Sequence, residues 1–415
     1  MDRVYADAAA ATPLSKRSRD ELVRLLEVYG NAGALHKEGV EAKNELEQAR
    51  KTIASAISAH PDEIIFTASG TEGNNLAING VLRPLLQQHG ELHAITLSIE
   101  HQSVLEPLRA LEADGLYTTE MPVNSEGLVS LEQLKETIND ETVFISIQLV
   151  NSEVGTVEPV REIAKLVRHI RKERGLGKSP LNSPSEALTF SEPATPLPLY
   201  FHCDASQAPL WIEMKVDALG CDLITLDGQK VLGPKGVGAL FVKRRTDIEP
   251  VTRGGVQEFG LRGGTPNVPL AAAFAVAFAD AQKNVEERVQ KVSAIRDFCF
   301  DEIKKRLPDA ILNGPSIKLE TTRSSRVANN LNISIPGLEA QMAVIALDAE
   351  GVAASTRSAC TIGNDEPSHV IKALGVAPEL AGTATRLTFL PSITKKEALF
   401  IAEALQRVAA LYRQK

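Results

Sequence analysis

Short apolar runs alternate with amphipathic segments over the first 245 or so residues of the chain. The runs are rich in Val, Ile, Leu and Phe, as is typical of buried β-strands. They fall at residues 63–68, 93–99, 142–150, 199–205, 221–226 and 237–243. Helix-like segments separate most of them, at residues 71–88, 103–114, 131–138 and 160–173. This alternation predicts an α/β fold with a mostly parallel sheet covered by helices on both faces.

The pattern changes after about residue 267, where long helical segments and a few short strands predict a smaller α+β domain. We therefore expect a large ligand-binding domain over residues 15–258. Residues 1–14 and 259–415 are expected to form the small domain. A Pro- and Ser-rich stretch at about 174–198 is predicted to be a solvated insertion, with a docking surface as the alternative. It joins a helix to the start of a strand, which places it away from the strand ends where ligands gather.

Polar residues and glycines follow the predicted strands at the point where each strand ends. They are Gly70, Thr71, His101, Asn151, Asp204, Gln207 and Lys230. In parallel sheets, ligands bind beyond the carboxyl ends of the strands. Taken singly, each residue is more often a helix cap or a turn residue than part of a binding site.

Together these residues predict a site for pyridoxal phosphate. That cofactor needs a lysine, a carboxylate for its ring nitrogen, a phosphate cradle and a flat stacking group. Lys230 in "DGQKVLGPKG", Asp204 in "FHCDASQ" and His101 in "SIEHQSV" supply three of these parts. The turn "TASGTEGNN" leads from a strand into a helix and suits a phosphate, although a simple N-cap by Ser69 or Thr71 is the alternative there.

Composition and charge narrow the class of protein. The chain has 415 residues, 43% of them hydrophobic and 24% charged, as in ordinary globular proteins. A formal net charge of −8 disfavours direct binding of nucleic acid, which calls for basic clusters. No apolar run approaches the ~20 residues that span a bilayer, and the N-terminus lacks the apolar core of an export signal. We expect a cytoplasmic protein that is not associated with membranes.

The chain has four cysteines without the paired spacing of a zinc site, and they are too few for a disulfide framework. No metal site is therefore expected. Cys203, Cys221 and Cys299 lie in apolar contexts and are predicted to be buried. Cys360 lies instead among small and polar residues in "STRSACTIGNDEP", so the local sequence allows either a structural cysteine or a nucleophile on a loop.

At this density of motifs, the sequence resembles the cysteine desulfurases of the NifS/IscS type, which are class V aminotransferases of fold type I. The resemblance runs in order from residue 4 to about residue 390. The segments that carry it include "VYADAAAATPL", "IIFTASGTEGNNLAI", "IEHQSVL", "VNSEVGTVEPV", "FHCDASQ", "GQKVLGPKGVGALFV", "GLRGGTPNV", "STRSACTIGNDEPSHVIKALG" and "TRLTF".

The resemblance implies a role for each residue that contacts the cofactor ring. Lys230 would hold the cofactor as a Schiff base, and Asp204 would pair with the ring nitrogen. Gln207 and Asn151 would contact the ring oxygen, with Asn151 also near the substrate. His101 would stack over the ring and help to transfer protons.

The resemblance also implies a phosphate site, a substrate clamp and a sulfur carrier. Gly70 and Thr71 would hold the phosphate, and Thr265 would reach it from the neighbouring subunit of a homodimer. Arg386 would bind the carboxylate of the substrate L-cysteine, a task that suits a guanidinium fork. Cys360 would attack the sulfur of the bound substrate, leaving alanine and a persulfide.

Several positions depart from the family pattern. Asp227 and Gln229 stand where Ser and His commonly contact the phosphate, and a carboxylate there repels a phosphate unless it turns away or is paired. Arg357 replaces a glycine near Cys360, and Ala11 replaces a threonine. The second arginine expected after Arg386 is missing.

We therefore predict a cysteine desulfurase that passes persulfide sulfur to an acceptor protein for iron–sulfur cluster assembly or tRNA thiolation. The alternatives are another class V enzyme, such as a selenocysteine lyase or a small-amino-acid aminotransferase, and a non-catalytic binding subunit. An aminotransferase has no need of Cys360, and a non-catalytic subunit need not keep Lys230 and Asp204.

Overall fold

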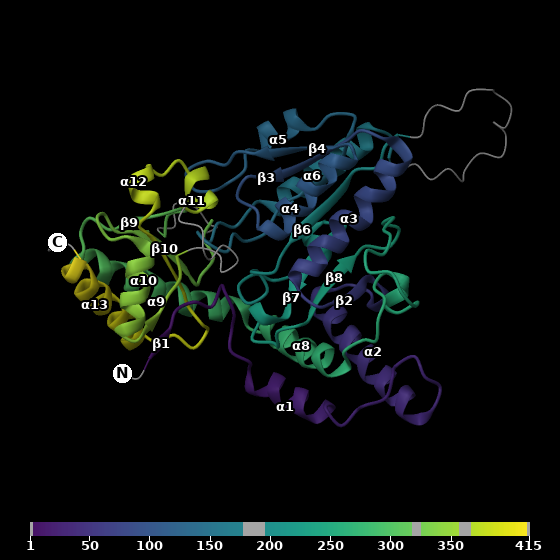
Figure 1. Ribbon diagram of the computed structural model, residues 1–415, viewed down its shortest axis with the longest axis horizontal. Helices are drawn as coiled ribbons and strands as arrows, with labels where there is room; N and C mark the ends of the chain where they lie inside the picture. The colour runs from purple at the N-terminus through teal and green to yellow at the C-terminus, as the bar shows by residue number, and fades with distance from the viewer. Residues whose placement is uncertain (1–2, 177–195, 318–324, 357–366, 413–415) are drawn as a thin grey trace.

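The computed structural model of the protein describes residues 3–176, 196–317, 325–356 and 367–412. Most of the 174–198 insertion lies outside these ranges. In Figure 1 the larger sheet and its helices lie to the right, and the C-terminal helices gather to the left. The division into domains at residues 15–258 stays a prediction.

A seven-stranded sheet with the order β2-β8-β7-β6-β5-β3-β4 forms the centre of the larger part. Its strands are β2 (Ile64–Thr67), β3 (Leu92–Leu97), β4 (Leu116–Met121), β5 (Thr142–Ser146), β6 (Tyr200–Asp204), β7 (Leu223–Asp227) and β8 (Gly238–Val242). The pairs from β4 through β7 are parallel, whereas β8 runs antiparallel to both β7 and β2. The predicted α/β class with a mostly parallel sheet is confirmed.

Burial on both faces explains why the central strands are continuous apolar runs. In β2, Ile64 and Phe66 belong to one hydrophobic cluster and Ile65 to the other. Alternate residues of a strand point to opposite faces, so the sheet separates two cores. The helices α3 (Gly70–His89) and α4 (Gln102–Leu111) contribute to the core that contains Ile65.

The other core joins the opposite face of the sheet to most of the remaining helices. The helices of the larger part outside α3 and α4 are α1 (Lys16–Leu25), α2 (Lys37–Ile57), α5 (Leu131–Thr137), α6 (Val160–Glu173), α7 (Val216–Leu219) and α8 (Val268–Ala281). Cys203 and Cys221 are buried in this core, as expected.

The C-terminal part contains a small antiparallel sheet with the order β12-β10-β9. Its strands are β9 (Ile311–Leu312), β10 (Asn330–Ser334) and β12 (Ala384–Thr388). Its helices are α9 (Val285–Arg306), α10 (Ala340–Ala349), α11 (His369–Ala373), α12 (Pro378–Ala381) and α13 (Lys395–Tyr412). The N-terminal strand β1 (Val4–Tyr5) pairs in parallel with β11 (Val352–Ala353), so the beginning of the described chain lies beside its C-terminal segments.

Candidate active site

A cavity of about 260 Å³ lies where the carboxyl ends of β6 and β7 meet the start of α3. It is lined by predicted site residues, namely Gly70, Thr71, His101, Asp204, Gln207, Asp227, Gln229, Lys230 and Arg386. Further lining residues include Ala9, Ala10, Asn74, Ser103, Gln148, Ser152 and Ser206. Residues far apart in the sequence therefore share one cavity, as the strand-end pattern leads one to expect.

The Asp204 carboxylate, at the end of β6, is held in a fixed orientation. Its Oδ2 accepts a hydrogen bond from Nδ2 of Asn74 at 2.8 Å, and its Oδ1 accepts one from the backbone N–H of Ser206 at 2.9 Å. Asn74 comes from α3 and also donates to Oγ of Ser103 at 2.8 Å. Sequence reasoning missed Asn74, although it lies inside the "TEGNN" motif.

His101 caps the N-terminus of α4, and this contact fixes its tautomer. Its Nδ1 accepts the backbone N–H of Ser103 at 3.1 Å, and the Ser103 hydroxyl lies 2.8 Å from the same atom. A backbone N–H can only donate, so the proton of the neutral ring lies on Nε2. The side chain of His101 thus both caps α4 and lines the cavity.

A second carboxyl group, that of Glu100, is fully buried next to His101. Its Oε1 accepts the backbone N–H of Gln148 at 2.8 Å. Burial, followed by the nearby charges of Asp204 and Glu158, raises the pKa of Glu100 well above its usual range. Burial and the neighbouring negative charges therefore favour the neutral form of Glu100 over a second negative charge beside Asp204.

Lys230 ends a 3-10 turn, Gly228–Lys230, that directly follows β7. Its amine donates to the backbone oxygens of Ala9 at 2.7 Å and Ala10 at 2.5 Å. Nε2 of Gln207 also donates to the oxygen of Ala9, at 2.9 Å. The N-terminal segment therefore forms one wall of the cavity and orients two of the predicted side chains.

The start of α3 forms the opposite end of the cavity. Ser69 is the N-cap of this helix, because its side chain accepts the backbone N–H of Glu72 at 3.1 Å. A Cβ on Gly70 would lie 2.8 Å from Oγ of Ser206 and 3.2 Å from Oδ2 of Asp227. Only glycine fits here without displacing a neighbour, so the backbone at the helix start can lie close to the carboxylate of Asp227.

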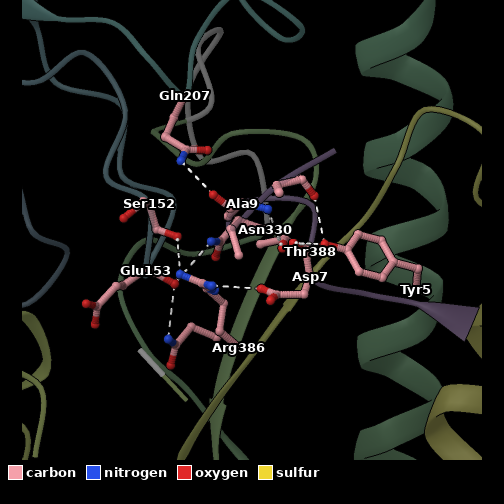
Figure 2. A network of polar contacts seen from close by, with 12 residues as sticks. Tyr5, Asp7, Ala9, Ser152, Glu153, Gln207, Asn330, Arg386 and Thr388 are labelled. Atoms are coloured by element: carbon pink, nitrogen blue, oxygen red, sulfur yellow. Dashed lines mark hydrogen bonds and ion pairs between the residues drawn. The ribbon is translucent and has the colours of Figure 1, made fainter. Parts of the chain in front are cut away.

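Arg386 reaches the cavity from β12 of the small sheet and is 1% exposed. Its Nη2 donates to Oδ1 of Asp7 at 2.8 Å, and its Nη1 donates to the backbone oxygen of Ser152 at 3.3 Å (Figure 2). Within the described part of the chain, Nε of Arg386 is buried without a hydrogen-bond partner. Asp7 was not singled out from the sequence, although it belongs to the "VYADAAAATPL" motif.

Three predicted site residues are not among those that line the cavity. Asn151 is buried in the turn after β5, where its Oδ1 accepts the backbone N–H groups of Glu153 and Val154, both at 2.9 Å. Thr265 is exposed in the segment before α8. Cys360, like Arg357, lies outside the described residues. The assigned roles of Asn151, Thr265 and Cys360 stay predictions.

Comparison with known proteins matches almost the whole chain. The sequence profile of the family "Aminotransferase class-V" matches residues 4–173 and 196–399. The chain therefore belongs to the class V aminotransferase family, whose members are enzymes that depend on pyridoxal phosphate. Within this family it groups with the cysteine desulfurases, as the motifs predicted.

Two sequence relatives and one solved structure support the placement of this chain with the cysteine desulfurases. Cysteine desulfurase IscS of Dictyoglomus turgidum is 38% identical over 98% of this chain and 94% of its own length. The mitosomal cysteine desulfurase of Trachipleistophora hominis is 37% identical over 92% of this chain and 81% of its own length. A solved NifS-like protein superposes with a TM-score of 0.85 at 28% identity, covering 99% of this chain and 100% of that structure.

Proposed function

We propose that this protein is a pyridoxal-phosphate-dependent cysteine desulfurase. It would convert L-cysteine to L-alanine and leave the sulfur as a persulfide on Cys360. In this reaction the C–S bond of free cysteine breaks, an S–S bond to Cys360 forms, and the carbon that loses sulfur gains a proton. The observation that carries the proposal is the meeting of Lys230, Asp204 and His101 in one cavity, in a chain similar to cysteine desulfurases over nearly its full length.

The chemistry of the cavity fits the cofactor. It offers one amine from Lys230, one oriented carboxylate from Asp204 and a ring from His101. At its other end, the start of α3 has the positive potential of a helix N-terminus, which suits an anionic group. When bound, pyridoxal phosphate supplies an electron sink for carbanion chemistry. Lys230 would hold it covalently, with Gln207 and Thr71 as further contacts.

The residues of this chain would then orient the substrate and handle its protons. The carboxylate of Asp204, fixed by Asn74, would keep a proton on the ring nitrogen of the cofactor. His101 would present Nε2–H toward the cavity as a proton carrier, because its Nδ1 is engaged by Ser103. Arg386 would bind the substrate carboxylate, since its buried Nε lacks a partner in the described part of the chain.

The alternative functions have less support. A small-amino-acid aminotransferase needs no thiol at position 360, and both sequence relatives above are named cysteine desulfurases. A non-catalytic binding subunit has no use for the amine of Lys230 or the carboxylate of Asp204, which line the same cavity. A selenocysteine lyase would use the same residues, so it is separated from a desulfurase by its substrate.

The partners follow from the same proposal. A homodimer would bring Thr265 to the phosphate of the neighbouring subunit, and a separate acceptor protein would take the persulfide sulfur for iron–sulfur clusters or tRNA thiolation. Within the described ranges, no helix is both long and apolar enough to cross a membrane. We propose the cytoplasm as the compartment, although one relative is mitosomal by name.

The proposal is tested by the absorption spectrum of the purified protein and by its products. We expect a yellow protein that releases one alanine for each sulfide when it receives L-cysteine and a reducing agent. Activity with selenocysteine in place of L-cysteine tests for a selenocysteine lyase. Formation of pyruvate from alanine tests for an aminotransferase. A colourless protein that takes up no pyridoxal phosphate would contradict the proposal.

Replacing Arg386 with lysine should raise the KM for L-cysteine. Lysine keeps the positive charge beside Asp7 but loses the planar fork, so one charge-assisted hydrogen bond to the substrate carboxylate is lost. That loss corresponds to a KM increase of about tenfold or more. The measurement is the initial rate of alanine formation against cysteine concentration, with Arg244→Lys as the control, since Arg244 pairs with Asp62 on the surface. An unchanged KM would remove Arg386 from the substrate site.

A further inference from the structure

The carboxylate of Asp227 lies at the end of the cavity that is suited to an anion. Asp227 is the last residue of β7 and is 7% exposed. Its Oδ2 accepts the backbone N–H of Gly70 at 3.3 Å. Its Oδ1 accepts the backbone N–H of Gln229 at 3.0 Å, and Nε2 of Gln229 donates to Oδ2 at 3.3 Å. The side-chain carboxylate of Asp227 thus accepts hydrogen bonds from backbone N–H groups at the start of α3 and in the 3-10 turn.

The same N–H groups are those that a bound phosphate requires. The first turn of a helix has free N–H groups and a positive potential, so it binds phosphate well. Gly70 is the first residue of α3, and its N–H already points to Asp227. A Cβ built on Gly70 comes within 3.3 Å of both Oδ2 and Cβ of Asp227, so the carboxylate is packed against the helix start.

The surrounding charges do not neutralise Asp227 through an ion pair. In the described residues, its hydrogen-bond donors are the N–H groups of Gly70 and Gln229, and it takes part in no ion pair. Besides Asp227, the charged or titratable side chains that line the cavity or lie in the first turn of α3 are Asp204, His101, Lys230, Arg386 and Glu72. His202 of β6 also contacts β7, through the hydroxyl of Thr225. Glu72 pairs with Arg262 and Arg386 pairs with Asp7, so these arginines are engaged elsewhere.

We propose that Asp227 is a specificity-determining residue that weakens binding of the cofactor's phosphate relative to its uncharged part. A phosphate dianion at the start of α3 would lie beside the carboxylate, in a poorly solvated place where like charges repel strongly. To admit the phosphate, the carboxylate must give up its hydrogen bond to the backbone N–H of Gly70 and turn away. The proposal rests on the proposed function, because it takes pyridoxal phosphate as the ligand.

The test compares two ligands that differ only in the phosphate. The full-length protein is freed of cofactor by dialysis and titrated with pyridoxal phosphate and with pyridoxal, with binding read from absorption and equilibrium dialysis. The variants are wild type, Asp227→Asn and Asp227→Ser. The asparagine keeps the size and an acceptor oxygen of the side chain but removes its charge. Asp62→Asn is the matched control, because it removes one negative charge at an exposed residue that does not line the cavity.

We expect Asp227→Asn to tighten pyridoxal phosphate by about tenfold or more, as removal of a nearby like charge should. Pyridoxal binding should change far less, and Asp62→Asn should change neither affinity. Asp227→Ser should act in the same direction, which keeps the test decisive if one variant folds poorly.

The outcomes separate this inference from the proposed function. If every variant binds pyridoxal phosphate but the ratio of the two affinities stays as in the wild type, the role of Asp227 is wrong and the desulfurase proposal stands. Weaker binding of pyridoxal phosphate by Asp227→Asn also overturns it, because the carboxylate would then be helping the phosphate. If no variant binds either ligand, both proposals fail. Binding of pyridoxal phosphate by the Asp227 variants but not by the wild type would support the role of Asp227 and contradict the proposed function of the wild-type protein.

Discussion

Cys360→Ser is expected to abolish sulfide release from L-cysteine, by about a hundredfold or more, while the cofactor spectrum remains. A serine hydroxyl cannot form the S–S bond that would carry the sulfur. The other three cysteines are buried and poor substitutes. Burial raises the pKa of the Cys299 thiol to about 12 and that of Cys203 well above its usual range, so neither forms a thiolate near neutral pH.

The measurement is the rate of sulfide formation together with detection of a persulfide on the chain by mass spectrometry. Cys299→Ser is the control, because its buried side chain can keep the contact that Sγ makes with the backbone oxygen of Ala398. Unchanged sulfide release by Cys360→Ser would mean that another group carries the sulfur. Loss in both variants would point to a folding defect instead.

Lys230→Ala should remove the covalent attachment of pyridoxal phosphate and lower alanine formation by about a hundredfold or more. The amine of Lys230 lies in the cavity beside the oxygens of Ala9 and Ala10. Without it, no described residue that lines the cavity offers a lysine amine to bind the cofactor aldehyde or to move a proton. The readout is the fraction of cofactor fixed to the protein by borohydride.

Lys235→Ala is the matched control for this experiment, because Lys235 lies in the same loop but is exposed. We expect it to keep both the borohydride-fixed cofactor and the activity. If Lys235→Ala loses the cofactor and Lys230→Ala retains it, the assignment of the two lysines is reversed.

The sequence predicted the central strands well because they are buried on both faces, which makes them continuous apolar runs. It did not reveal β4 (Leu116–Met121), whose residues "LYTTEM" are only partly buried at the edge of the sheet. A half-exposed edge strand needs no apolar run, so periodicity gave no signal there. The long helical segments expected after about residue 267 correspond to α8 and α9.

The strand-end pattern predicted many of the residues that line the cavity, since parallel strands bring their carboxyl ends to one edge. It could not predict which residues orient them. Asn74 reaches Asp204 from the second turn of α3, and Asp7 meets Arg386 across 379 positions in the sequence. For Asn151 the sequence showed a polar residue after a strand, but not that its side chain would hold a turn.

The pairing of Asp7 with Arg386 has a consequence for how the protein is made. The seven-stranded sheet is complete once residue 242 has been synthesised, whereas Arg386 follows much later. A chain still on the ribosome can therefore fold its large sheet before Arg386, which lines the cavity from β12, has been synthesised. The N-terminal segment, with Ala9 and Ala10 at the cavity, gains its partner strand β11 only after residue 353 has been synthesised. We therefore expect the site to be assembled after the large sheet, because it joins contacts of very high sequence separation.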